Sequence, residues 1–151
     1  MPHKATSADA ELILKLYDLR REAEMRKARN WWLSFWPESA DDFMKVGTAL
    51  GTQENAWLRQ VGSYWELVAS LVNHGTLSKE LFLEPSISGE MFLIFSKVQP
   101  FLKELREQMH SPTAFANMEK LITSAEGGME RVKMTQERMA MFRKAQLAKA
   151  S

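Results

Sequence analysis

The residues of this chain that could bind a metal are few and scattered. Glu107 and His110 form a Glu-x-x-His pair on one predicted helix. Di-iron carboxylate proteins use this spacing twice, together with two further glutamates. Here it occurs once, and the other histidines, His3 and His74, are far from it in sequence. We therefore predict that the protein needs no metal and interpret the Glu107–His110 pair as a solvated helix end.

Covalent catalysis is also hard to build from this sequence. The chain has no cysteine, which excludes thiol nucleophiles, disulfides and Cys-ligated metal sites. It has no G-x-S-x-G elbow for a serine nucleophile, and its glycines form no phosphate-binding loop. His74 closely follows a long predicted helix, where the helix dipole favours a protonated side chain. We therefore expect a protein that is not an enzyme and has no cofactor.

The length and the charge of the chain further limit the class of protein it can be. A chain of 151 residues fits one domain, which we place over 1–151. Its 20 basic and 19 acidic residues give a net charge of +1. Nucleic-acid-binding domains usually have a strong excess of basic residues, so this charge does not indicate one. The start of the chain is polar and lacks the apolar core of a signal peptide. Because the longest apolar run covers only 91–95, far short of the roughly 20 residues of a membrane span, we expect a cytoplasmic protein.

Apolar residues recur with helical spacing almost everywhere, which predicts an all-α fold. We expect a single-domain irregular bundle of six to seven helices, centred on helices over 53–73, 90–109 and 112–126. Pro100 should kink the second of these, and 85–89 should be a loop. The last helix should run over about 129–148. Residues 1–7 should be flexible and residues 145–151 should fray.

A long N-terminal helix is predicted over 8–35. Thr6 and Asp9 are spaced for a capping box at its start, and Pro37 stops it. At about 28 residues it is more than twice as long as an average helix. Such a helix usually projects beyond its own domain or packs against a partner.

Four large aromatic side chains end this helix: Trp31, Trp32, Phe35 and Trp36, here called the aromatic cluster. Each ring buries roughly 150–250 Å², so the cluster must face the core, a partner or a membrane surface. Basic residues before it suit a membrane-surface helix, but Glu22 and Glu24 interrupt them and favour an ordinary charged face. We predict that the protein is a homodimer through its first helix and this cluster.

Two further sets of side chains could form binding surfaces. Methionines in the last helix suit an adaptable surface, although the spacing also fits a seam packed on the core, which we favour; they are Met129, Met134, Met139 and Met141. A small-molecule pocket could be lined by Trp57, Tyr64, Trp65 and Phe95. Trp65 shares a helix face with Val61 and Val68, so we also expect it to lie at the centre of the core.

The segment over 64–82, YWELVASLVNHGTLSKELF, resembles a family of uncharacterised bacterial helical domains. In that family a helix ends in a polar-glycine turn and is followed by a short leucine-rich segment. A further helix has an aromatic start, a proline in its middle and a late arginine, matched here by Phe92, Pro100 and Arg106. The resemblance covers about 57–121. It implies a bacterial, all-helical domain and lends no catalytic residues, because the family has no assigned activity.

The function that these observations favour is a non-enzymatic interaction or scaffold domain that binds another protein or a second copy of itself. One alternative is a regulatory domain that binds a small molecule in the predicted pocket. The other is a peripheral membrane protein that uses the tryptophans of the aromatic cluster.

Overall fold

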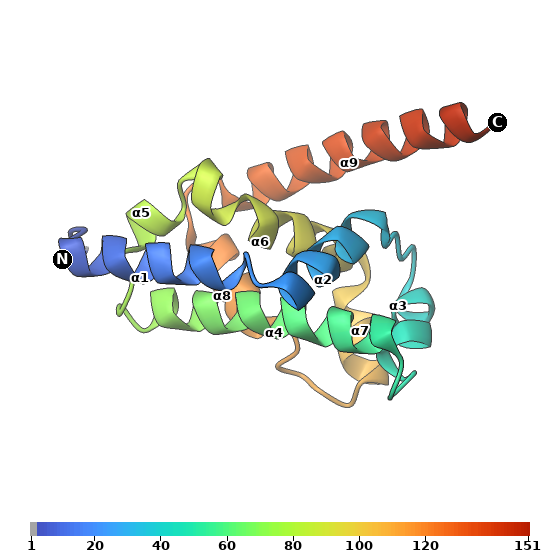
Figure 1. Ribbon diagram of the computed structural model, residues 1–151, viewed down its shortest axis with the longest axis horizontal. Coiled ribbons are helices and arrows are strands. Elements are labelled where there is room, and N and C mark those ends of the chain that lie inside the picture. Colours follow the sequence, from blue (N-terminus) through green and yellow to red (C-terminus); the bar gives the residue numbers. More distant parts are fainter. Residues whose placement is uncertain (1–2) are drawn as a thin grey trace.

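The computed structural model describes residues 3–151, and Met1 and Pro2 lie outside that part (Figure 1). Within it the regular elements are all helical, and their number exceeds the six or seven predicted. They are α1 (Ser7–Leu19), α2 (Ala23–Ser34), α3 (Ala40–Gly47), α4 (Gln53–Asn73), α5 (Lys79–Phe82), α6 (Pro85–Val98), the 3-10 turn η1 (Gln99–Phe101), α7 (Leu102–Gln108), α8 (Ala116–Ser124) and α9 (Gly128–Ala150). No helix in the described range is both long and apolar enough to cross a membrane.

Helix α4 lies at the centre of the bundle, as predicted. It packs against α2, α3 and α8, while α6 packs against α9 (Figure 1). The buried face of α4 carries Val61, Trp65 and Val68, of which Trp65 is 2% exposed. Phe95 of α6 and Leu121 of α8 are buried in the same apolar core. The prediction that Trp65 belongs to the core is therefore confirmed.

The long first helix predicted over 8–35 is wrong, because the chain bends at 20–22 and forms α1 and α2 separately. The Glu22 carboxylate accepts a hydrogen bond from the Met25 N–H at 2.9 Å and so starts α2 with a side-chain cap. The bend turns α2 onto α4 and buries Met25, Ala28 and Trp32. Burial of these side chains and the new cap offset the few helical hydrogen bonds that the bend removes.

The second half of the bundle follows the prediction with shifted boundaries. The kink expected at Pro100 is present as the turn η1 between α6 and α7. The loop predicted over 85–89 is instead the start of α6, because Pro85 occupies the first turn, where its missing N–H costs nothing. The helix predicted from 112 begins only at Ala116, because Phe115 before it adopts a φ of +59°.

A carboxylate from α4 fixes the start of α8. Glu66 accepts hydrogen bonds from the backbone N–H groups of Asn117 at 3.2 Å and Met118 at 2.8 Å. These groups would otherwise lack partners at a helix N-terminus. The central helix therefore sets the position of α8 through a polar contact as well as through the core.

The N-terminal residues from His3 onward make specific contacts with the rest of the chain. The expected capping box is present, with the Asp9 N–H donating to the Thr6 hydroxyl and the Thr6 N–H donating to the Asp9 carboxylate. Asp9 is buried, which by itself raises its pKa, but hydrogen bonds from the Ser78 and Thr6 backbone, the Thr6 hydroxyl and His3 hold the pKa well below its usual range. The 2.7 Å bond from the Ser78 N–H ties α1 to the turn before α5. Met1 and Pro2, also predicted to be flexible, lie outside the described residues.

The C-terminal end also differs from the prediction. Residues 145–150, expected to fray, continue α9 as exposed helix to Ala150. Alanine, lysine, glutamine and leucine make up this stretch, and all of them favour helix.

Candidate functional surfaces

A partly buried ion cluster lies where the bend at 20–22 meets α4 and α6. Glu90 Oε2 accepts a hydrogen bond from Arg29 Nε at 2.7 Å and lies 3.6 Å from Arg20 Nη2. Glu90 Oε1 accepts the indole N–H of Trp65 at 3.0 Å. The Arg20 and Glu90 side chains are only 12% and 14% exposed. One carboxylate thus holds two guanidinium groups and the central tryptophan together, and we call this set the Arg20 cluster.

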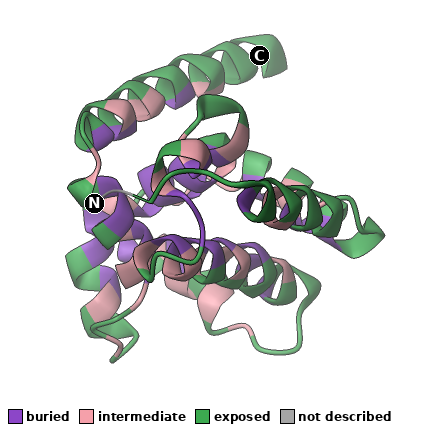
Figure 2. Ribbon diagram, turned by 90° about the vertical axis from the view of Figure 1, so that its left-hand side faces the viewer, coloured by how far each residue is buried: buried purple, intermediate pink, exposed green. Residues whose placement is uncertain are grey.

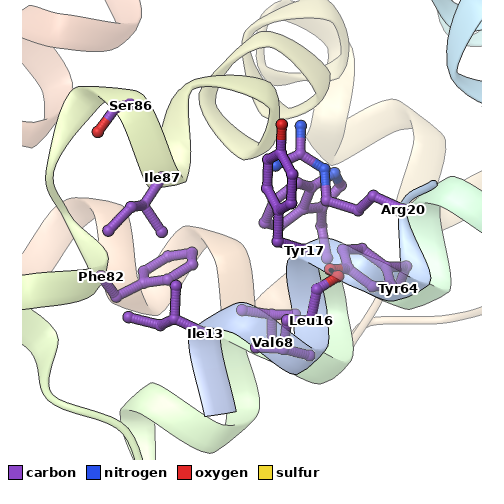
Figure 3. Close-up of a pocket in the computed structure, with 10 residues that line it drawn as sticks. Ile13, Leu16, Tyr17, Arg20, Tyr64, Val68, Phe82, Ser86 and Ile87 are labelled. Carbon is purple, nitrogen blue, oxygen red and sulfur yellow. Dashed lines mark hydrogen bonds between the residues drawn. The ribbon is translucent and has the colours of Figure 1, made fainter. Parts of the chain in front are cut away.

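Aromatic rings enclose the Arg20 guanidinium. Its central carbon lies 5.5 Å from the ring centre of Tyr17 and 5.2 Å from that of Trp65, and Figure 3 shows Tyr17 beside it. The buried Nε of Arg20 has no hydrogen-bond partner among residues 3–151. Nearby, the Tyr64 hydroxyl donates to the Leu16 carbonyl at 2.5 Å, and burial raises the pKa of Tyr64 to about 12. This hydroxyl therefore stays protonated and acts as a structural donor.

The pocket beside the Arg20 cluster is too small for an organic ligand. Its free volume is about 40 Å³, against the 300–1,000 Å³ typical of small-molecule sites. Ile13, Phe82 and Ile87 close one end of it (Figure 3). The space suits ordered water, and the Arg20 cluster mainly locks the bend onto the core.

The predicted ligand pocket does not form from all four of its residues. Tyr64 and Trp65 line the small pocket together, edge to face, with ring centres 4.9 Å apart. Phe95 is instead enclosed in the core, and Trp57 is not on the pocket wall. Trp57 and Trp65 are eight positions apart in the sequence, which places them about 12 Å apart along the helix axis.

A second polar site lies where the end of α2 meets α6 and η1. Lys97, only 6% exposed, donates from Nζ to the carbonyl oxygens of Trp32 and Phe35, the latter at 2.8 Å. Its Nζ also lies 4.3 Å from the ring centre of Trp36. Burial, with a smaller effect of the Arg143 charge, lowers the pKa of Lys97 to about 8. Lys97 thus caps the C-terminal carbonyls of α2 with a costly buried cation.

A groove opens beside this lysine, and we call it the Lys97 groove. Its volume is about 470 Å³. The walls come from the α2–α3 connection, the end of α6 and the second half of α9, and include Trp36, Pro37, Glu38, Pro100, Met139, Arg143, Lys144 and Leu147. Arg143 Nη1 pairs with Glu38 Oε1 at 2.7 Å across the groove. The result is an apolar channel of ligand size with cationic groups on its floor and rim.

The shifted pKa of Lys97 predicts a pH-dependent stability. The unfolded chain keeps Lys97 protonated up to its usual pKa of 10.5, while the folded chain releases the proton near pH 8. Because the unfolded state binds more protons between these values, this contribution to the free energy of unfolding rises with pH. Between about pH 8 and pH 10 we expect the wild type to gain about 1–2 kcal/mol over Lys97→Met in urea unfolding. Parallel pH curves for the two proteins would contradict this.

The aromatic cluster packs against its own chain. Trp32 is buried in the core at 1% exposure, and Trp31 stacks on Phe35 with ring centres 4.5 Å apart. Phe35 also contacts Phe43 of α3, while Trp36 covers Lys97. The bend at 20–22 turns the cluster inward, so Trp32 offers no surface to a partner and the other three rings are half-buried. This corrects the expectation for Trp32, while an interface through the other three rings stays a prediction.

The Glu107–His110 pair lies at the exposed end of α7, as interpreted from the sequence. Within residues 3–151, no group of three or more histidine, aspartate or glutamate side chains is placed to hold a metal ion.

A family model described as a domain of unknown function, DUF4760, matches residues 5–125, which is most of the chain. The chain belongs to the DUF4760 family. This agrees with the resemblance to an uncharacterised family of helical domains. No curated protein and no solved structure matches the chain.

The DUF4760 match spans α1 to α8, and α9 follows it. The first half of α9 is held on α6: Val132 is buried, Gln136 donates to the Ser96 carbonyl at 3.1 Å, and Arg131 lies over the Phe92 ring at 3.8 Å. Toward its end the helix leads away from the DUF4760 bundle and is mostly exposed (Figures 1 and 2). One wall of the Lys97 groove is therefore built by α9 and the other by the DUF4760 domain.

The predicted methionine seam in α9 is only partly present. Met139 is 9% exposed and packs inward, whereas Met134 and Met141 are 59% and 71% exposed on the opposite side. Sequence reasoning also missed Lys97, although a signal exists. It is the one charged residue within the apolar stretch over 91–98, and an isolated lysine there is buried with its helix face.

Proposed function

We propose that this DUF4760 protein is a non-enzymatic interaction or scaffold domain that works by contact and forms a homodimer. We place the dimer interface on the outward side of α9 and not at the aromatic cluster, because the aromatic cluster packs against its own chain. The observation that supports this move is an exposed stripe on that side, here called the outer face of α9: Met134, Arg138, Met141, Ala145 and Ala148. The cytoplasmic location and bacterial origin expected from the sequence stay part of the proposal.

The spacing of this stripe is that of a helix–helix seam. Its members follow one another at intervals of four, three, four and three residues, the pattern of facing positions in a coiled coil. Met134 and Met141 supply flexible apolar surface, and the two alanines allow close approach of a second helix. The stripe covers only about two heptads, so we expect a dimer that dissociates on dilution.

Charges beside the outer face favour an antiparallel pair. Glu137 and Lys144 lie seven residues apart on the same flank of the stripe, and neither has an ion-pair partner within residues 3–151. In an antiparallel dimer Glu137 meets Lys144 of the second copy, and two such pairs form by symmetry. In a parallel dimer each flanking charge would instead face the position five residues further along the second copy, so Glu137 would meet Phe142, Lys144 would meet Lys149, and no such pair would form.

Sedimentation velocity over a range of concentrations tests the dimer. We expect the wild type to shift from monomer to dimer as concentration rises, and Met141→Glu to stay monomeric because it buries two carboxylates at the seam. Met141 is exposed, so circular dichroism should show unchanged helix content in this variant. A wild-type protein that remains monomeric at high micromolar concentration would refute the proposal. Loss of the dimer in Trp36→Ala but not in Met141→Glu would return the interface to the aromatic cluster.

The antiparallel orientation has its own test. Glu137→Lys and Lys144→Glu should each weaken the dimer several-fold, because each places like charges opposite one another. The double exchange should restore the wild-type dissociation constant. If the double exchange associates no better than the single variants, the antiparallel orientation is wrong even though the dimer exists.

A further inference from the structure

The Lys97 groove has the size and walls of a small-molecule site. Its volume of about 470 Å³ falls in the range of ligand pockets, unlike the pocket at the Arg20 cluster. Trp36, Pro100 and Leu147 line it with apolar surface that a ligand body could cover. The apolar stripe of the proposed dimer lies on a different side of α9, and the dimer shares with this groove only Lys144, which lies at the edge of both surfaces.

The charge in the groove is unbalanced. Lys97, Arg143 and Lys144 line it with three cations, and Glu38 is the one carboxylate on its wall among the described residues. Lys97 is buried against carbonyl oxygens and a ring, with no carboxylate in ion-pair distance within residues 3–151. A buried cation without an anion is costly, so the groove would gain free energy from a bound negative charge.

Arg143 offers the donors for such an anion. A guanidinium carries five N–H donors in a fork that matches a carboxylate. Only its Nη1 is engaged, in the pair with Glu38, within the described residues. A carboxylate on the free side of Arg143 would lie in the groove that Lys97 and Lys144, the other two cations of its lining, also face.

We propose that the Lys97 groove binds a small apolar monocarboxylate, with the carboxylate on Arg143 and the hydrocarbon along Trp36, Pro100 and Leu147. The open groove between α3 and α4 is larger, at about 670 Å³, but selects no such ligand. There Glu66 already caps α8, and Arg59 already donates to Asn55 at 3.0 Å. The Lys97 groove has the size of a ligand site, and its three cations are balanced by only one carboxylate among the described residues.

Isothermal titration calorimetry with sodium octanoate tests this proposal on the full chain. Octanoate should bind, 1-octanol should bind at least about tenfold more weakly, and octylammonium should not bind, because a charged hydrogen bond contributes about 1.5–3 kcal/mol. Saturable binding of octanoate alone supports the site. Equal affinity for octanoate and octanol, or no octanoate binding at millimolar concentration, overturns it.

Paired variants of α9 locate the site. Arg143→Gln should weaken octanoate binding about tenfold or more, whereas Arg138→Gln, the same change on the outer face, should leave it unchanged. Leu147→Glu places a carboxylate in the groove at a residue that is 63% exposed, and it should abolish binding while circular dichroism stays that of the wild type. If Arg138→Gln and Arg143→Gln weaken binding equally, the carboxylate does not lie in this groove.

Discussion

Trp65→Ala is expected to unfold the protein or to leave it insoluble. The indole is 2% exposed, contacts the rings of Tyr64 and Phe82, and donates its N–H to Glu90. Truncating such a side chain leaves a large cavity and costs roughly 3–5 kcal/mol, while a typical domain has only 5–15 kcal/mol in total. Thermal melts followed by circular dichroism, together with the soluble yield, measure the effect.

Trp57→Ala is the matched control for this prediction. Trp57 lies on the same helix but is only half-buried, so its removal leaves a smaller cavity. We expect Trp57→Ala to melt between the wild type and Trp65→Ala. If Trp65→Ala melts like the wild type, the core does not depend on the face of α4 that carries Val61 and Val68.

Local periodicity was enough to predict the centre of the fold. The face of α4 repeats apolar residues from Leu58 to Val72, about four turns, so one side of this helix had to be buried whatever surrounds it. Thr6 could be recognised as a cap from the sequence as well, since a capping box depends on residues three positions apart. The kink at Pro100 likewise follows from the proline itself.

The bend at 20–22 could not be predicted from the same kind of pattern. No proline or glycine marks it, and good helix formers surround it. The bend lets α2 pack on α4, which a straight helix projecting from the domain could not do. Its cap, Glu22, is a residue type that usually stays inside helices, so the sequence carries little sign of it. The direction of the aromatic cluster depends on this bend, so the burial of Trp32 in the core could not be predicted either.

The Arg20 cluster and the contacts of Lys97 could not be predicted from the sequence for another reason. Arg29 and Glu90 are 61 residues apart, and neither has a neighbour in sequence that suggests the other. The acceptors of Lys97 are backbone carbonyls, which every residue has, so no side-chain motif could reveal them. Such contacts depend on how the helices pack in the tertiary structure, so they cannot be predicted from a single sequence.

Glu90→Gln is expected to produce the other large loss of stability. Glutamine keeps the length of the side chain and an oxygen for the Trp65 N–H, so the change removes mainly the charge. Arg20 and Arg29 then stay in their places without the carboxylate they share. Removing one partner of a fully buried pair costs roughly 3–5 kcal/mol, because the remaining charge loses its compensation, and the partial exposure of this cluster places the expected loss at about 3 kcal/mol or somewhat less. Urea unfolding at neutral pH gives the difference in free energy.

Glu119→Gln separates this effect from the loss of any ion pair. Glu119 pairs with Arg106 at 3.1 Å, but it is 41% exposed, and such surface pairs contribute about 0–1 kcal/mol. If Glu90→Gln is as stable as Glu119→Gln, water reaches the Arg20 cluster and the bend is held by α2 packing alone. If it is several kcal/mol less stable, the single carboxylate of α6 holds both the bend and Trp65 in place. Loss of Glu90 would then loosen the two features of the fold on which α2 and the aromatic cluster depend.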